Sequence, residues 1–197
     1  MLLAIDSATA ACSAALIDAG QVIDERFELV GRGHAERLLP MIEELLAGRR
    51  PSAILVDCGP GSFTGVRVGL AAAHGLAIGW AIPLAGYSSM AAIAAASGAG
   101  AVALHGGHGQ LFVQSFDHDP LRASHPLQSL LPEDAAAAVH ALVVAGSGAE
   151  ALVSARGHGQ ALDALPRAAD ARLLPEALRS LPGRPIYGRG PDAKPMA

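Results

Sequence analysis

Two short polar segments in the N-terminal half of the chain carry residue types that can bind an anion. The first comprises Asp6, Ser7 and Thr9, which follow an apolar run at the start of the chain. A carboxylate at the end of a strand with hydroxyl groups behind it can form a phosphate-binding loop. The same residues can equally form an Asx or ST turn that closes a hairpin. The sequence therefore predicts a turn here and leaves a vestigial phosphate loop open.

The second segment is rich in glycine and connects an apolar run to a helical one. Its seven residues are Gly59, Pro60, Gly61, Ser62, Phe63, Thr64 and Gly65. A loop of this kind at a helix N-terminus suits an anion, but it matches neither the Walker A pattern nor the GxGxxG pattern. Arg67 follows in the expected first turn, where the helix dipole disfavours a cation. We therefore expect Arg67 to have a partner, such as an acidic residue or a phosphate.

No set of residues with the spacing of a catalytic or metal site stands out. The eight histidines form neither HxxxH nor HExxH, and the chain has no GxSxG nucleophile elbow. Cys12 and Cys58 lie inside apolar runs and are expected to be buried core residues. The sequence therefore predicts no catalytic residue and no metal site.

The elements that must position these loops follow from hydrophobic periodicity. The pattern over residues 2–29 predicts three antiparallel strands. After them it predicts a helix over 34–47, a strand over 53–56, a helix over 65–79, a strand over 81–84 and a helix over 88–96. This order is that of a ribonuclease H-like unit. A weaker version follows, with strands over 101–104, 110–117, near 121–126 and over 141–145, and helices from Pro132, around Glu150 and over 175–181. The predicted division is a lobe over 1–98, a smaller lobe over 99–181 and an extended tail over 182–197.

Two of the predicted helices carry ridges that favour close packing. Gly65, Gly69 and Ala73 recur every four residues, and each interior glycine costs roughly 1 kcal/mol relative to alanine in a helix. A close helix–helix crossing would compensate for this cost, and the second helix belongs either to this chain or to another chain. The helix over 34–47 offers a companion ridge of Leu38, Leu39, Ile42 and Leu46. Two such helices can form half of a four-helix bundle with a partner.

Composition excludes several classes of protein. The 197 residues are 51% hydrophobic and 16% charged, which is the reverse of a disordered chain. The net charge of −4 argues against a free-standing nucleic-acid binder. The N-terminus lacks the positive region of a signal peptide, and the low-charge stretch 68–85 is better explained as a buried helix and strand than as a membrane span. We therefore expect a cytoplasmic protein.

The run Gly-Pro-Gly-Ser-Phe-Thr-Gly-Val-Arg-Val-Gly over 59–69 closely resembles the signature of the TsaB (YeaZ) family of bacterial tRNA threonylcarbamoyladenosine proteins. Three further segments are similar to that family: residues 5–9 with 12–16, residues 34–42 and residues 185–194. The resemblance is dense over 2–97, thin over 98–181 and returns in the tail.

The resemblance implies an α/β protein with the actin-like (ASKHA) fold, in which two ribonuclease H-like lobes have mixed sheets flanked by helices and the second lobe is reduced. It also implies a non-catalytic scaffold that pairs with the catalytic paralogue TsaD and with the ATPase TsaE, meets tRNA only through the complex, and forms a homodimer as an alternative in isolation. No cofactor is expected in the isolated chain, and ATP or ADP only at the assembled complex. The expected partner interface consists of His34, Leu38, Leu39, Ile42, Leu46, Gly65, Arg67, Gly69 and Ala73.

The chain departs from the family pattern at several positions. TsaD-like proteins carry a metal-binding HxxxH after the fifth strand, whereas residues 86–90 contain no histidine. Residues 105–110, His-Gly-Gly-His-Gly-Gln, replace an Asp-Ala-Arg turn followed by Gly-Glu, and His74 stands where the family often has lysine. The alternatives are an actin-like nucleotide-binding phosphotransferase or ATPase, which the two polar loops favour, and a glycopeptidase-like hydrolase, for which no ligand set exists.

Overall fold

The first sheet begins with the antiparallel meander that its alternating apolar residues predict. The computed structural model describes residues 1–188. In it β1 (Leu2–Asp6), β2 (Ala11–Asp18) and β3 (Gln21–Leu29) pair in sequence. β4 (Ala53–Asp57) and β5 (Leu84–Tyr87) then add in parallel beside β1, which gives the order β3-β2-β1-β4-β5. Parallel neighbours require crossover connections, and helices supply them here.

Three helices cover this sheet. α1 (His34–Leu46) and α2 (Phe63–Trp80) pack on one face, and α3 (Ser89–Ser97) packs on the other. Strand alternation divides β1 between these faces: Leu3 and Ile5 contact the α1 and α2 side, and Ala4 contacts the α3 side. The abundance of alanine in α3 lets it lie close to the sheets on either side of it.

The second lobe repeats the architecture with shorter elements. Its sheet has the order β11-β10-β6-β7-β8, with β9 also paired to β7. The strands are β6 (Ala101–Gly107), β7 (Gln110–His118), β8 (Leu121–Ala123), β9 (Gln128–Leu130), β10 (Val143–Ala145) and β11 (Gln160–Leu162). α4 (Pro132–Ala138) and α5 (Ala149–Arg156) cover its outer face. The reduction lies in the length of the strands and helices, since four of these strands have three residues each.

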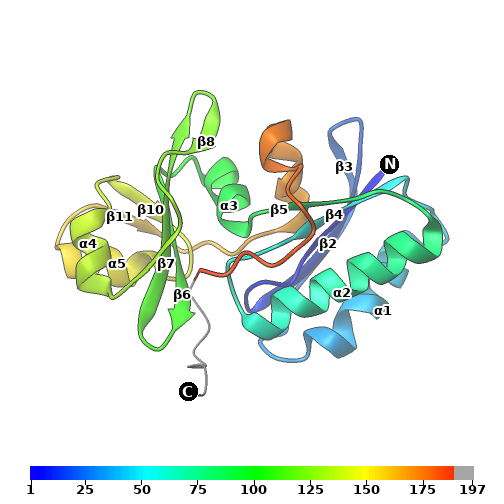
Figure 1. Cartoon of the computed structure of the whole chain (residues 1–197), viewed down its shortest axis with the longest axis horizontal. Helices are drawn as coiled ribbons and strands as arrows, with labels where there is room; N and C mark the ends of the chain where they lie inside the picture. The colour runs from blue at the N-terminus through cyan, green and yellow to red at the C-terminus, as the bar shows by residue number, and fades with distance from the viewer. Residues whose placement is uncertain (189–197) are drawn as a thin grey trace, which may run out of the picture.

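The layers follow one another across the molecule, as Figure 1 shows: α1 and α2, the first sheet, α3, the second sheet, and α4 with α5. One hydrophobic core lies in the middle of this stack. It joins Ala4 and Leu55 of the first sheet, Met90 of α3, and Leu104 and Phe116 of the second sheet. The actin-like fold of two lobes with mixed sheets flanked by helices is therefore confirmed.

Three details differ from the sequence-based expectation. The fifth strand begins at Leu84, three residues after Ala81, because Ala81 ends α2 with a left-handed backbone (φ 54°). Over 175–181, where a helix was expected, the structure has the short 3₁₀ turn η2 (Glu176–Leu178), and another 3₁₀ turn, η1 (Ala168–Leu173), precedes it. η1 packs against β1, β2, β3 and α3, so the chain returns to the first lobe well before residue 181, where the second lobe was expected to end.

The tail expected to be extended over 182–197 is described only as far as Gly188, and residues 189–197 lie outside the described part of the chain. Among residues 1–188 no helix is both long enough and apolar enough to span a bilayer.

Candidate functional site

The glycine-rich loop lies directly on the turn between β1 and β2. A Cβ atom at Gly61 would overlap the carbonyl oxygen of Ala8, and one at Gly65 would overlap the carbonyl oxygen of Ser7. The Ser62 N–H donates to the Ala8 carbonyl at 2.6 Å. These positions need glycine because only a missing side chain lets the two backbones approach so closely.

Hydroxyl groups hold this contact in place. The Ser7 hydroxyl donates to the Gly65 carbonyl at 2.9 Å, and a Cβ atom at Gly69 would overlap that same hydroxyl. Ser62 caps α2, since its side chain accepts the Gly65 N–H at 3.2 Å. The ridge of Gly65, Gly69 and Ala73 is therefore an internal contact, one of the two alternatives that the sequence left open.

The side chains of the expected phosphate loop form hydrogen bonds within the β1–β2 turn. Asp6 and Ser7 are buried, and Asp6 Oδ1 accepts the Ala8 N–H at 3.2 Å. The Thr9 hydroxyl accepts the Ala11 N–H at 3.2 Å. These are the contacts of a closed turn and favour the turn interpretation, while the phosphate loop stays a prediction.

A second buried carboxyl group lies beside Asp6. Asp57, at the end of β4, accepts the N–H groups of Gly59 at 3.0 Å and Ser89 at 2.8 Å, both through Oδ1. Burial raises the pKa of Asp6 to about 7, and it raises the pKa of Asp57 well above its ordinary range with help from the charge of Asp6. Tyr87 lies against this pair with its hydroxyl 3.3 Å from Asp6 Oδ2.

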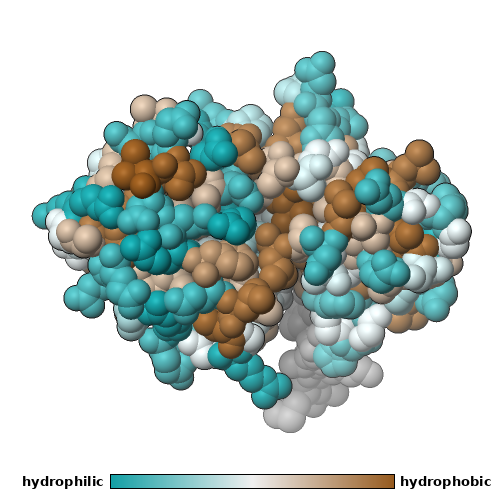
Figure 2. Space-filling model, turned by 180° about the vertical axis from the view of Figure 1, so that it is seen from behind, coloured by the Kyte–Doolittle hydropathy of each residue, from teal (hydrophilic) through white to brown (hydrophobic). Residues whose placement is uncertain are grey.

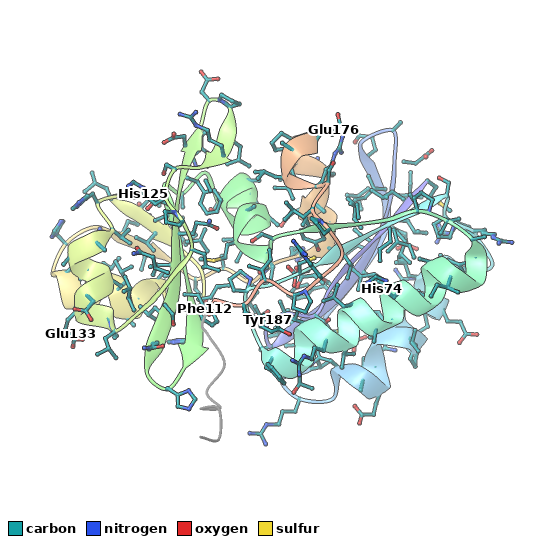
Figure 3. All side chains as sticks on the ribbon, in the orientation of Figure 1. His74, Phe112, His125, Glu133, Glu176 and Tyr187 are labelled. Atoms are coloured by element: carbon teal, nitrogen blue, oxygen red, sulfur yellow. The ribbon has the colours of Figure 1, made fainter. Side chains whose placement is uncertain are left out.

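A cleft of about 1090 Å³ opens between the lobes. The glycine-rich loop and the β1–β2 turn form one wall, and His105, Phe112 and Ser147 of the second lobe form part of the other. In Figure 3 Phe112 and Tyr187 approach this space from different elements. Figure 2, which shows the molecule from behind the view of Figure 1, has hydrophobic surface along the boundary between the lobes. No aspartate or glutamate lines the cleft among the described residues.

Arg67 has an aromatic partner at the mouth of the cleft. Its guanidinium lies 3.4 Å from the ring centroid of Phe63 and 5.9 Å from that of Tyr187, and it donates to the Tyr187 hydroxyl at 3.0 Å. The rings are 61% and 58% exposed. The expectation of a partner is met by stacking, and the helix begins at Phe63, which places Arg67 beyond its first turn.

Most residues of the expected partner interface face inward. Leu38, Ile42 and Leu46 pack in the core under α1 and α2, together with Ala73. His34 is also buried, with Nε2 3.2 Å from the Ala11 carbonyl oxygen. The prediction that these side chains, together with Gly65 and Gly69, contact another chain is therefore corrected. They attach the helices to their own sheet. Leu39, which is 50% exposed, and Arg67 remain on the surface.

A different face of α2 lies open. Ala71, Gly75 and Gly79 recur every four residues on it, and a Cβ atom at Gly75 or Gly79 would meet nothing within 4 Å. Ile78 on the same face is 80% exposed. The sequence contains the spacing of this stripe, but the glycine signature on the adjacent face of the helix is the stronger signal.

The segment 181–188, which we call the strap, returns along the first lobe beside the cleft. Leu181 pairs with Gly86 on the open edge of β5, and the Ile186 N–H donates to the Cys58 carbonyl at 2.7 Å. The ring of His74, labelled in Figure 3, lies 2.8 Å from the Gly183 carbonyl oxygen. At its end, Gly188 lies against the ring of Phe112 in the second lobe. The strap therefore touches both walls of the cleft.

Titratable side chains that could bind a metal are dispersed. Within residues 1–188 no three His, Cys, Asp or Glu side chains come together in a metal-binding arrangement. His105 and His108, in the segment that departs from the family pattern, lie on the β6–β7 hairpin, and His105 lines the cleft.

Known proteins share this chain's sequence and architecture. A family model described as TsaD, tRNA N6-adenosine threonylcarbamoyltransferase, matches residues 27–156. The tRNA threonylcarbamoyladenosine biosynthesis protein TsaB of Escherichia coli K12 is 45% identical over 98 residues. A solved structure from Pseudomonas aeruginosa, described as similar to the peptidase YeaZ, is 32% identical with a TM-score of 0.76, over 95% of this chain and 99% of that one. The chain belongs to the TsaB (YeaZ) family.

Coverage differs among the relatives. The match with the Escherichia coli protein covers 47% of this chain and 42% of that protein, so the chain spans less than half of that relative. An uncharacterized protein of Mycobacterium tuberculosis H37Rv is 32% identical over 100% of this chain and 95% of its own length.

Proposed function

We propose that this TsaB-family chain is a non-catalytic subunit in the biosynthesis of threonylcarbamoyladenosine in tRNA, and that it works in the cytoplasm by pairing with a TsaD-like catalytic paralogue. The open face of α2 is the observation that carries the pairing. Two glycines in the interior of an exposed helix face cost helix stability, and nothing within the described chain compensates for that cost. A partner helix packed against Gly75 and Gly79 would do so.

The geometry of that face suits a helix from another chain. Small residues at 71, 75 and 79 allow two backbones to approach closely, and Ile78 beside them supplies an apolar side chain to bury. Leu39 on the neighbouring helix α1 is a second exposed apolar side chain. Pairing through α1 and α2 is therefore retained as a proposal, with the outer residues Ala71, Gly75, Ile78 and Gly79 in place of the buried ones.

Further parts of the proposal concern the assembled complex. A TsaE-like ATPase would join the pair, ATP or ADP would bind only at the assembled complex, and tRNA would be held mainly by the other subunits. The mildly acidic net charge of −4 supports the last point, because affinity for nucleic acid depends on basic groups. A homodimer through the same α2 face is the alternative in isolation.

Size-exclusion chromatography of the chain mixed with a purified TsaD paralogue tests the pairing. We expect co-elution with the wild-type chain and loss of co-elution with Ile78→Asp, because a carboxylate would be buried in the interface. Leu142→Asp is the matched control, since Leu142 is 68% exposed on the second lobe and should leave co-elution intact. Co-elution of all three chains alike would refute this interface, and no co-elution of the wild type would refute the pairing.

A nucleotide-binding phosphotransferase remains the second candidate, favoured by the large cleft, which Arg67 borders and which no carboxylate of residues 1–188 lines. The inward orientation of Asp6 argues against it. Calorimetric titration of the isolated chain with ATP and Mg²⁺ separates the two, and we expect no tight binding.

A further inference from the structure

Asp6 and Asp57 bring two carboxyl groups together inside the first lobe. β1 and β4 are parallel neighbours with Ile5 opposite Val56, so the next residue on each strand is an aspartate at the same edge of the sheet. Neighbouring strands are separated by about 4.8 Å. Both side chains are almost completely buried. The sheet therefore places two acids next to each other where water does not reach them.

The hydrogen bonds of this pair are incomplete. Each Oδ1 atom accepts backbone N–H groups: Ala8 donates to Asp6, while Gly59 and Ser89 donate to Asp57. Asp57 Oδ2 is buried and has no partner among the described residues. A buried carboxylate oxygen without a donor is costly, whereas a protonated carboxyl can donate from that position.

Tyr87 can donate to only one of the two oxygens that its hydroxyl faces. Its hydroxyl carries one hydrogen but lies near two oxygens, the Ile5 carbonyl at 3.1 Å and Asp6 Oδ2 at 3.3 Å. When the hydroxyl donates to the shorter contact, the other is favourable only if Asp6 donates in turn.

Within the described part of the chain, no cation balances the two acids. Among residues 1–188 neither carboxyl forms an ion pair with the N-terminus or with a lysine, arginine or histidine side chain. The titratable groups that face the pair are Cys12 on β2, Tyr87 on β5, Asp170 on η1 and Cys58 beside Asp57. Burial raises the pKa of the Cys12 thiol to about 11, that of Cys58 to about 12 and that of Tyr87 well above its ordinary value, so these three groups are neutral at pH 7.

We propose that Asp6 and Asp57 share one proton at neutral pH and that this proton acts as a switch on the two loops that wall the cleft. The pair holds the first of these loops through the Ala8 N–H in the β1–β2 turn. It holds the other through the Gly59 N–H at the start of the glycine-rich loop. Loss of the proton leaves two buried like charges, and the repulsion between them is relieved by moving one loop outward into water.

The sign of the pH dependence follows from the direction of the shifts. Burial raises the pKa of Asp6 from 3.8 to about 7, so the folded chain keeps a proton that the unfolded chain has already lost. The resulting stabilisation is complete below the unfolded value and falls as the pH rises toward and through about 7. The melting temperature should therefore decrease between about pH 6 and pH 8.5.

The test combines carboxyl NMR with amide exchange. In protein labelled with ¹³C at aspartate carboxyls, we expect one resonance of the pair to titrate near neutral pH while exposed aspartates have already titrated. Over the same range, exchange at Ala8 and Gly59 should rise more than the intrinsic base-catalysed increase, and exchange in β2 should not. A pair that is fully ionised at pH 6 overturns the proposal.

Variants supply the independent arm. Asp57→Asn keeps an acceptor for Gly59 and Ser89 and places an N–H donor at the Oδ2 position, so it should reduce the fall in melting temperature between pH 6 and pH 8.5 to the part that the burial of Asp6 contributes. Asp117→Asn, on the exposed Asp117–Arg122 pair, should leave that fall unchanged. The carboxyl NMR of the wild type decides the matter if Asp57→Asn does not fold. Restoration of the melting temperature at pH 8.5 by Mg²⁺, lost in Asp57→Asn, would assign the pair to a cation and overturn the proton switch.

Discussion

At the scale of single residues, the glycine signature is explained by one contact. Gly61 and Gly65 meet backbone atoms of Ala8 and Ser7, and Gly69 meets the Ser7 hydroxyl. The signature therefore encodes how closely α2 lies on the β1–β2 turn. Arg67, inside the same motif, has a different role because it stacks on Phe63 at the surface.

Two glycines of the same helix should respond to alanine with opposite sign. Gly65→Ala forces a methyl group against the Ser7 carbonyl oxygen, and such overpacking costs typically about 1–3 kcal/mol. Gly75→Ala places its methyl group in open space and should gain about 0.5–1 kcal/mol from helix propensity. Urea unfolding of the isolated chain measures both changes. A stability for Gly65→Ala equal to or above the wild type would contradict the proposed backbone contact.

At the scale of elements, the sequence predicted what is local and periodic. The meander, α1 and the order of strands and helices in the first lobe follow from apolar spacing and turn residues. The direction in which the Leu38 and Gly65 ridges face could not be predicted, because an internal and an external crossing need the same small and apolar residues. The return of η1 to the first lobe was also missed, since it depends on long-range contacts such as that of the Ala168 N–H with the Ser13 hydroxyl at 2.9 Å.

The strap is the element whose attachment depends most on one residue. At Gly86 a Cβ atom would overlap Cys58 Sγ and press on the Pro182 carbonyl oxygen. Gly86→Ala should therefore loosen the strap from β5, and hydrogen exchange should show faster exchange at the Leu181 and Ile186 N–H groups, which β5 and Cys58 now hold. Gly75→Ala is the control, with exchange in the strap unchanged. Unaltered exchange at both positions in Gly86→Ala would mean that the strap is held mainly by other contacts.

At the scale of the whole molecule, one central core joins the two lobes, and we expect them to unfold as one cooperative unit. α3 lies between the sheets, and its buried residues contact both. The low aromatic content fits this arrangement, because an alanine-rich helix can pack against a sheet on each side. The exposed small-residue face of α2 extends the same use of small side chains to the surface.

Met90→Ala tests this cooperativity because Met90 is fully buried in α3 between the sheets. Truncation of a buried methionine typically costs about 2–5 kcal/mol. We expect one transition, in which the fluorescence of Trp80 in the first lobe and the amide protection of β7 in the second lobe are lost at the same, lowered denaturant concentration. Loss of protection in β7 at a concentration where Trp80 still reports a folded first lobe would show that the lobes unfold separately. The shared core would then contribute little to their coupling, and the position of one cleft wall relative to the other would depend chiefly on the strap.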